Sequence, residues 1–153
     1  YHKSTGEVGL AHVGTREHST GDGIMILFNY PVPIDNPAER AVRMALAIRE
    51  EVLQRAEDWA RRGYDLSLGI GIAQGYATIG AIGFEGRWDY SAIGTVTNLA
   101  ARLCSEAAGG EILIAQKVFA GVEALLDVDP PEVLALKGLR RPVTTYRVRG
   151  LKA

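Results

Sequence analysis

The order of strand-like and helix-like segments is the feature of this sequence that most constrains its fold. Apolar runs and alternating apolar and polar residues predict strands over residues 9–19, 24–28, 66–73, 77–87, 112–114, 133–137 and 143–148. Helical spacing of apolar residues predicts helices over residues 37–62, 98–106 and 116–126. Hairpins are therefore mixed with three helices, without the regular βαβ alternation of a parallel sheet. This order predicts an α+β fold in which helices pack against an antiparallel or mixed sheet.

Glycines mark the turns and one unusual strand. Gly21-Asp22-Gly23 lies between the first two predicted strands and predicts a β-hairpin with Asp22 at its tip. Gly69, Gly71 and Gly75 fall in or next to the strand at 66–73, and glycine weakens a strand unless another backbone or a ligand comes close to it. A turn is expected at Gly75 and the residue after it, so that two glycine-rich strands would form a second hairpin.

The composition is that of an ordinary globular domain. The chain has 153 residues, 47% hydrophobic and 23% charged, so residues 1–153 are expected to form one domain with a sizeable core. The formal net charge of −1 gives no electrostatic reason to expect binding to nucleic acid or to an anionic membrane. The sequence shows no run long enough for a membrane span and no signal-peptide pattern.

Cysteine and histidine usage narrows the chemistry further. The single Cys104 excludes an internal disulfide, favours a reducing, cytoplasmic location, and is expected to be a small core residue. The three histidines His2, His12 and His18 have no metal-ligand companions at useful spacing, so a zinc site is not expected. Residues 1–8 read poorly as the start of a domain, and Tyr1-His2-Lys3 reads like the tail of a helix, so we expect this chain to be a piece of a longer protein.

The segment Arg87–Leu103 passes from a strand into a helix. Aromatic and polar residues alternate at its start, which predicts a half-buried strand, and Thr95 or Thr97 can cap the helix that follows. Asn98 and Arg102 stand four residues apart and therefore share one helix face. An amide and a guanidinium on the first turns of a glycine-led helix can hold a hydroxyl and an anion together. The same spacing is also that of an ordinary solvated helix face.

Four stretches, in register along nearly the whole chain, resemble the class III nucleotide cyclase homology domain. They are Gly21–Met25, Gly69–Gly83, the strand end and Asn-x-x-x-Arg helix of Arg87–Leu103, and Leu136–Gly138 followed by Pro142 and Tyr146. The resemblance implies the family's ferredoxin-like core and a head-to-tail homodimer with active sites at the subunit interface. It also implies a bacterial-type cyclase that converts a nucleoside triphosphate into a 3′,5′-cyclic nucleotide and pyrophosphate for intracellular signalling.

The resemblance also gives each candidate residue a role. Asp22 matches a metal-binding aspartate of a site for two Mg²⁺ or Mn²⁺ ions. Asn98 matches the residue that orients the ribose, Arg102 the one that stabilises the pentacovalent transition state, and Lys137 the one that holds the terminal phosphates. The family's first metal-binding aspartate lies upstream of the Gly-Asp pair, so this chain is expected to lack it, although two divalent ions need at least two carboxylates.

Base selection rests on two further positions. His18 falls where the family commonly has lysine, and Ser91 falls where it has aspartate or threonine. Ser91 can still donate or accept a hydrogen bond as threonine would, whereas an imidazole is neutral or partly charged near pH 7. ATP is therefore the preferred substrate, with GTP as the alternative. Tyr76 falls where some members carry a phosphate-binding arginine, a departure that could lower activity.

Two other functions stay open at this point. A degenerate homology domain could bind nucleotide or regulate a partner by dimerisation without turnover, and the departures at His18 and Tyr76 favour this alternative. An interaction domain with no nucleotide site is the third alternative. Asp22 would then be an ordinary turn residue and Lys137 an exposed turn lysine, since Asp-Gly and Lys-Gly are common in turns.

Overall fold

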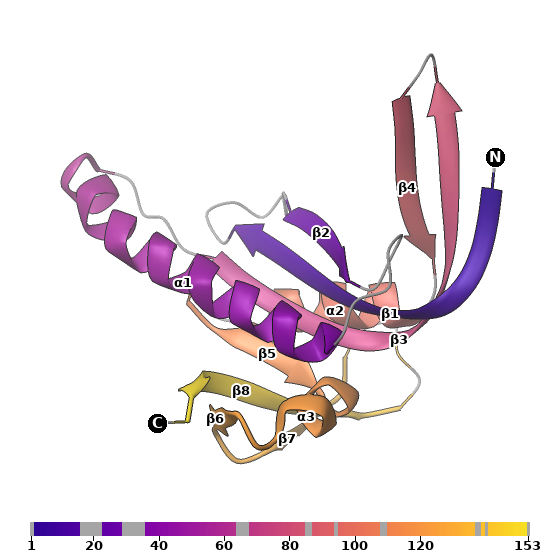
Figure 1. The fold of residues 1–153 in the computed structure, drawn as a ribbon. Coiled ribbons are helices and arrows are strands. Elements are labelled where there is room, and N and C mark those ends of the chain that lie inside the picture. The colour runs from indigo at the N-terminus through magenta and orange to yellow at the C-terminus, as the bar shows by residue number, and fades with distance from the viewer. Residues whose placement is uncertain are drawn as a thin grey trace.

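The computed structural model describes residues 2–15, 23–28, 36–63, 68–84, 87–93, 95–107, 110–136, 139 and 141–152. Within these residues the strands are β1 (His2–Thr15), β2 (Gly23–Phe28), β3 (Leu68–Phe84), β4 (Arg87–Ile93), β5 (Ile112–Ala115), β6 (Leu126–Val128), β7 (Glu132–Leu134) and β8 (Val143–Leu151). The helices are α1 (Pro37–Arg61), α2 (Thr95–Glu106) and α3 (Gln116–Val122). The predicted α+β class is confirmed (Figure 1).

The described strands form one mixed sheet. Its order is β2-β1-β3-β5-β8-β6, with β4 paired to β3 and β7 paired to β8. β3 and β5 run parallel, and the other pairs are antiparallel. The first predicted hairpin is confirmed, because β1 pairs with β2 from Gly9 opposite Phe28 to Gly14 opposite Gly23. Its tip, with Asp22, lies outside the described residues.

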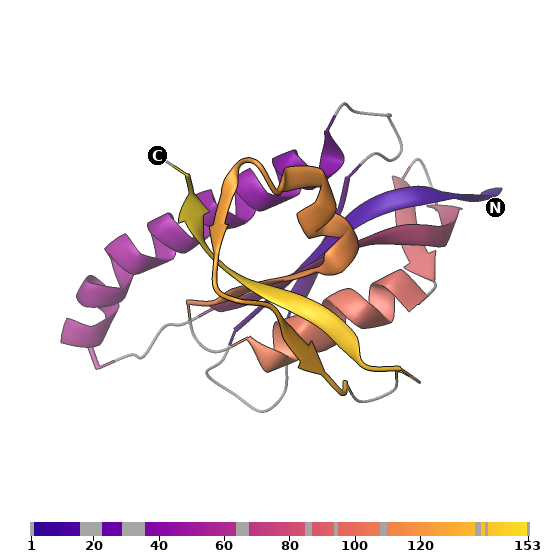
Figure 2. The same ribbon diagram turned by 90° about the horizontal axis from the view of Figure 1, so that it is seen from below.

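Helices cover both faces of the sheet, as Figure 2 shows from below. α1 and α3 share one core with the side chains that alternate toward them from the strands, among them Val42, Ile70 and Ile72. α2 shares a second core on the other face with Leu10 and Leu113. The glycines of β3 point toward α2, because they alternate with the isoleucines that face α1.

The length of the first and third strands corrects two expectations. Residues 2–8 do not form the tail of a helix; they are part of β1, which pairs with β3 from His2 opposite Ala81 to Thr15 opposite Leu68. The turn expected at Gly75 is absent, because β3 continues through it to Phe84. Both strands stay extended because each pairs with the other along this whole length, which no local pattern reveals.

The predicted second hairpin forms one strand later than expected. β3 pairs with β4 from Thr78 opposite Ile93 to Phe84 opposite Arg87, and this hairpin rises away from the body of the sheet (Figure 1). The helix expected over 116–126 is also shorter, because Leu126 is buried at the start of β6 instead. None of the described helices is long and apolar enough to cross a membrane.

Candidate functional site

α2 sits on β3 at a depth that only glycine permits. A Cβ at Gly71 would lie 2.7 Å from the Cβ of Leu103 and would also overlap the carbonyl oxygen of Ala100 and the amide nitrogen of Cys104. A Cβ at Gly69 would lie 3.0 Å from the carbonyl oxygen of Ala107. Glycines in a strand are expected where another backbone or a ligand comes close, and here the backbone of α2 comes close to Gly69 and Gly71.

Cys104 also stabilises the contact between α2 and β3. Its thiol is buried and donates a hydrogen bond to the carbonyl oxygen of Gly69 over 3.3 Å. The expectation that Cys104 is a core residue is confirmed. α2 begins at Thr95, so Thr95 and Thr97 lie in its first turn and not at the cap position, which falls outside the described residues.

Asn98 and Arg102 lie on the face of α2 that points away from the sheet. The buried side of the helix consists of Val96, Ala100, Leu103 and Cys104, and both candidate residues are exposed. Within the described part of the chain, neither side chain has a hydrogen bond or an ion pair with a protein group. The amide and the guanidinium are thus presented together to whatever binds on this face, as their spacing predicts.

Arg147 shows what a structural arginine looks like in the same fold. Its guanidinium donates to Glu132 over 2.9 Å and to Glu111 over 2.5 Å, which ties the start of β5 to β7 and β8. The hydrogen bond to Glu132, together with the charges of both carboxylates, raises the pKa of Arg147 despite its partial burial. Arg102 forms no ion pair with a described carboxylate, so its guanidinium is available to a ligand.

Two residues that flank Lys137 in the sequence pack in the core beneath α2. Leu136 is buried and Leu139 partly buried in the core that contains Val96, Ala100 and Leu103 of α2. The amide of Leu139 donates to the carbonyl oxygen of Leu136 over 3.2 Å. Lys137 itself lies outside the described residues.

The other predicted site residues are only partly placed. Ser91 is on β4, paired with Gly80, and β4 leads directly into the start of α2. The side chain of Ser91 is not described, and His18 and Asp22 lie outside the described residues. The structure therefore brings Asn98 and Arg102 together on α2, places Leu136 and Leu139 in the core beneath that helix, and leaves the roles of all the site residues as predictions.

Thr15, the last described residue before the tip of the first hairpin, and Asn98 lie near opposite ends of α2. Thr15, the last described residue of β1, pairs with Leu68, next to Gly69 and the C-terminal end of α2. The first turn of α2 lies over Gly75 instead, where Val96 is the nearest side chain. Six strand residues separate these two points, a distance of about 20 Å.

His12 is a residue whose environment the sequence did not reveal. It lies on β1 opposite Gly71, and its Nδ1 atom is buried without a hydrogen-bond partner in the described part of the molecule. Desolvation by burial lowers the pKa of His12 below its usual value. No group of three or more His, Cys, Asp or Glu side chains among the described residues could hold a metal ion. An alternating pattern alone could not show that this imidazole is buried.

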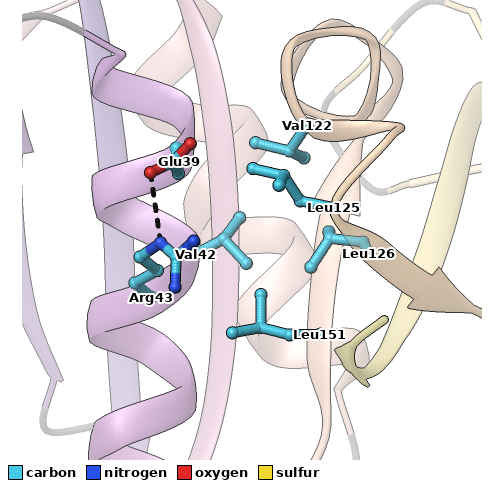
Figure 3. A pocket seen from close by; sticks show the side chains of 7 residues that line it. All are labelled: Glu39, Val42, Arg43, Val122, Leu125, Leu126 and Leu151. Atoms are coloured by element: carbon cyan, nitrogen blue, oxygen red, sulfur yellow. Dashed lines mark hydrogen bonds and ion pairs between the residues drawn. The ribbon is translucent and has the colours of Figure 1, made fainter. Parts of the chain in front are cut away.

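One hollow lies away from these groups, on the α1 side of the sheet (Figure 3). Val42, Val122, Leu125, Leu126 and Leu151 line it, and the ion pair between Glu39 and Arg43, 3.1 Å long, lies at its edge. Its lining is mostly apolar, and its one guanidinium, that of Arg43, is already paired with Glu39. Because α2 covers the other face, this hollow is not part of the candidate site.

Comparison with known proteins identifies the family of the chain. Residues 10–150 match the family described as the adenylate and guanylate cyclase catalytic domain. This chain is a member of that family. The cyclase domain is 31% identical over 150 residues to Adenylate cyclase 1 of Rhizobium meliloti (strain 1021), which covers 95% of this chain and 22% of that protein. An uncharacterized protein of Mycobacterium tuberculosis (strain ATCC 25618 / H37Rv) is 31% identical over 93 residues, 61% of this chain and 16% of that protein.

Solved structures share the fold of the cyclase domain. The guanylyl cyclase Cya2 superposes with a TM-score of 0.86 at 22% identity, covering 97% of this chain and 94% of that one. The adenylyl cyclase CyaB from P. aeruginosa superposes with a TM-score of 0.85 at 24% identity, covering 99% of this chain and all, 100%, of that one. The domain spans about a fifth of the length of Adenylate cyclase 1, as the 22% coverage gives. The resemblance proposed from the four sequence motifs is confirmed.

Proposed function

We propose that this domain converts ATP into 3′,5′-cyclic AMP and pyrophosphate, and that its active site is shared between two head-to-tail copies. The observation that carries the proposal is the pair Asn98 and Arg102, exposed side by side on α2 with no partner among the described residues. Membership of the cyclase family supports a nucleotide substrate and a lyase reaction. The separation between Thr15, at the tip side of the hairpin, and the first turn of α2 supports a second copy as the source of Asp22.

Each residue has a defined task in this reaction. The amide of Asn98 would orient the ribose so that its 3′-hydroxyl faces the α-phosphorus, which places the reacting atoms in line. The guanidinium of Arg102 would stabilise the charge that develops on the phosphorus oxygens in the transition state. Lys137 would hold the terminal phosphates as a compact positive charge and so position the leaving pyrophosphate.

A divalent metal is part of the proposed site. The family generally uses divalent metals, and Asp22 is proposed as a ligand for Mg²⁺ or Mn²⁺. The described residues contain no cluster that fits a metal ion, and one aspartate does not hold two ions. When bound, such an ion would favour deprotonation of the attacking hydroxyl.

Adenine recognition is proposed for His18 and Ser91. Ser91 is on β4, the second strand of the rising hairpin, which leads along the chain to the two candidate residues on α2. Its hydroxyl can satisfy either a donor or an acceptor on a purine edge. The substrate choice is tested by comparing ATP with GTP on the full-length protein, each with Mg²⁺ and with Mn²⁺.

The shared site is tested by complementation. Asp22→Ala and Arg102→Ala should each abolish cyclic nucleotide production, since each removes a group from both sites of a dimer. An equal mixture of the two variants should recover about a quarter of the parent activity, because half of the dimers carry one intact site. Unchanged activity in both single variants would refute the site assignment. Loss in both without recovery on mixing would place Asp22 and Arg102 in the same copy.

A nucleotide-binding module without turnover is the second candidate function. The departures at His18 and Tyr76 favour it. It predicts that ATP with Mn²⁺ raises the melting temperature while no cyclic nucleotide forms. An interaction domain with no nucleotide site predicts neither effect.

A further inference from the structure

β7 is a short strand at the edge of the described sheet. Its three residues, Glu132–Leu134, pair with β8 and with no other described strand. A ladder of this length supplies few backbone hydrogen bonds, and a pair of strands is marginal without further packing. Val133 in the middle of β7 is 67% exposed, so burial adds little at that position. Side-chain contacts therefore contribute much of what fixes β7 in place.

Glu132 makes such contacts with two side chains of β8. The buried hydroxyl of Thr145 donates to the carbonyl oxygen of Glu132 over 3.2 Å. The Nε atom of Arg147 donates to the carboxylate of Glu132 over 2.9 Å, and the side chain of Arg147 is only 27% exposed. A hydrogen bond between two charged groups is stronger than one between neutral groups. Both the backbone and the side chain of Glu132 are thus attached to β8.

The second hydrogen bond of Arg147 extends this connection to the strands beneath α2. Its Nη1 atom donates to the carboxylate of Glu111 over 2.5 Å. Glu111 directly precedes β5, and its carbonyl oxygen accepts a hydrogen bond from the amide of Ile70 on β3 over 3.1 Å. α2 packs on β3 and β5. Arg147 therefore connects β7 to the part of the sheet that sets the position of α2.

β7 leads along the chain to Lys137. Leu134 at the end of β7 packs against the core beneath α2, and Leu136 is buried in that core. Lys137 follows Leu136 directly, so their Cα atoms are about 3.8 Å apart. Arg102, the proposed transition-state residue, projects from α2 itself. The position of Lys137 relative to Arg102 thus depends on how β7 is held relative to α2.

We propose that Arg147 is a positioning residue for the end of the site that binds the terminal phosphates, and that it acts through Glu132 and β7 on Lys137. A guanidinium suits this role, because its planar fork of donors holds two carboxylates in fixed directions. The inference deepens the proposed function and rests on it, since it takes Lys137 as the residue that holds these phosphates. Arg147 itself touches neither the substrate nor the product.

Pyrophosphate binding to the full-length protein, measured by isothermal titration calorimetry, tests the inference. Lys137→Ala should raise the Kd for pyrophosphate at least about tenfold, as expected when a hydrogen bond to a charged group is lost. Arg147→Ala should raise the same Kd at least about threefold, and no further than Lys137→Ala does. The Kd for AMP, which lacks the terminal phosphates, should not change in either variant. Partial unfolding would instead lower the number of binding sites for both ligands.

Two further variants make the test independent of how well Arg147→Ala folds. Glu132→Gln keeps the size of an exposed side chain but removes its charge, and it should raise the Kd for pyrophosphate in the same direction. Arg149→Ala is the matched control, because Arg149 lies two residues further along β8 and pairs with Asp129. This control should bind pyrophosphate as the parent does. An equal rise in Kd for Arg149→Ala and Arg147→Ala would contradict a specific role of Arg147.

A double variant shows whether Arg147 acts through Lys137. Arg147→Ala combined with Lys137→Ala should bind pyrophosphate no more weakly than Lys137→Ala alone, because the positioned group is already absent. Additive losses would overturn the inference, and so would a parent-like Kd in both Arg147→Ala and Glu132→Gln. An unchanged Kd in Lys137→Ala would refute the proposed role of Lys137 and, with it, the inference.

Discussion

Gly71 on β3 lies so close beneath Cys104 on α2 that a methyl group at position 71 would overlap the amide nitrogen of Cys104. This contact sets how deeply α2 sits on the sheet. Asn98 and Arg102 project from the same helix, so their height above the sheet follows from a residue on a different element. Gly71 has no side chain, yet it determines the position of the side chains of Asn98 and Arg102 relative to the sheet.

Gly71→Ala should destabilise the domain by about 1–3 kcal/mol, the usual range for forcing an extra methyl group into a packed core. The added Cβ meets the backbone of α2, which cannot move aside as a flexible side chain would. Urea denaturation of the variant measures this loss. Gly75→Ala on the same strand is the matched control, because its Cβ would meet Val96 at an ordinary 3.4 Å. Equal losses in both variants would mean that strand propensity, and not the depth of α2, is responsible.

Arg102→Ala should lower cyclic nucleotide production by about 10²–10³-fold, as expected when one donor to transition-state charge is removed. The free energy of unfolding should change by less than about 0.5 kcal/mol, since the side chain is exposed and unpaired among the described residues. An activity assay and a denaturation curve on the same preparation separate the two effects. Arg40→Ala, an exposed arginine on the other face of the sheet, should leave both quantities unchanged. A large stability loss in Arg102→Ala would instead indicate a structural role.

Stability should fall as the pH is lowered because of His12. Burial lowers the pKa of His12 in the folded chain below the value of about 6.5 that it has when unfolded. The unfolded chain therefore binds more protons below that pH, so the contribution of neutral His12 is complete above pH 6.5 and is lost as the pH falls below it. Thermal unfolding between pH 7.5 and 5.5, each pH being about a unit from that midpoint, measures the effect. In His12→Gln the melting temperature should depend less on pH, and parallel curves for parent and variant would contradict the assignment.

Arg49 joins α1 to the last strand through two hydrogen bonds. Its guanidinium donates to the carbonyl oxygens of Val148 over 3.0 Å and of Arg149 over 2.6 Å. Arg49→Lys should cost about 1–2 kcal/mol in urea denaturation, since an ammonium does not span both acceptors in the same way. Arg43→Lys changes the same residue type in the same helix, where only an exposed pair with Glu39 is affected, and should cost less than about 0.5 kcal/mol. Similar losses of unfolding free energy in the two variants would show that the two hydrogen bonds to β8 add no measurable stability.

Local patterns were enough for most elements and for the pairing of Asn98 with Arg102. A helix repeats every 3.6 residues and a strand every two, so α1, α2, β2 and β5 follow from the spacing of their own apolar residues. The same spacing puts an amide and a guanidinium on one helix face wherever that helix lies. The family resemblance rests on motifs of this local kind, and the match over residues 10–150 confirmed it.

The tertiary structure alone decided the features that depend on contacts between distant segments. Gly75 reads as a turn in its own neighbourhood, but β3 stays extended there because β1 pairs with it from Leu68 to Ala81. The burial of the Nδ1 atom of His12 and the overlap that excludes a side chain at Gly71 likewise depend on which element lies opposite. Local sequence encodes the period of an element, whereas the neighbour that covers each face is set only when the chain packs.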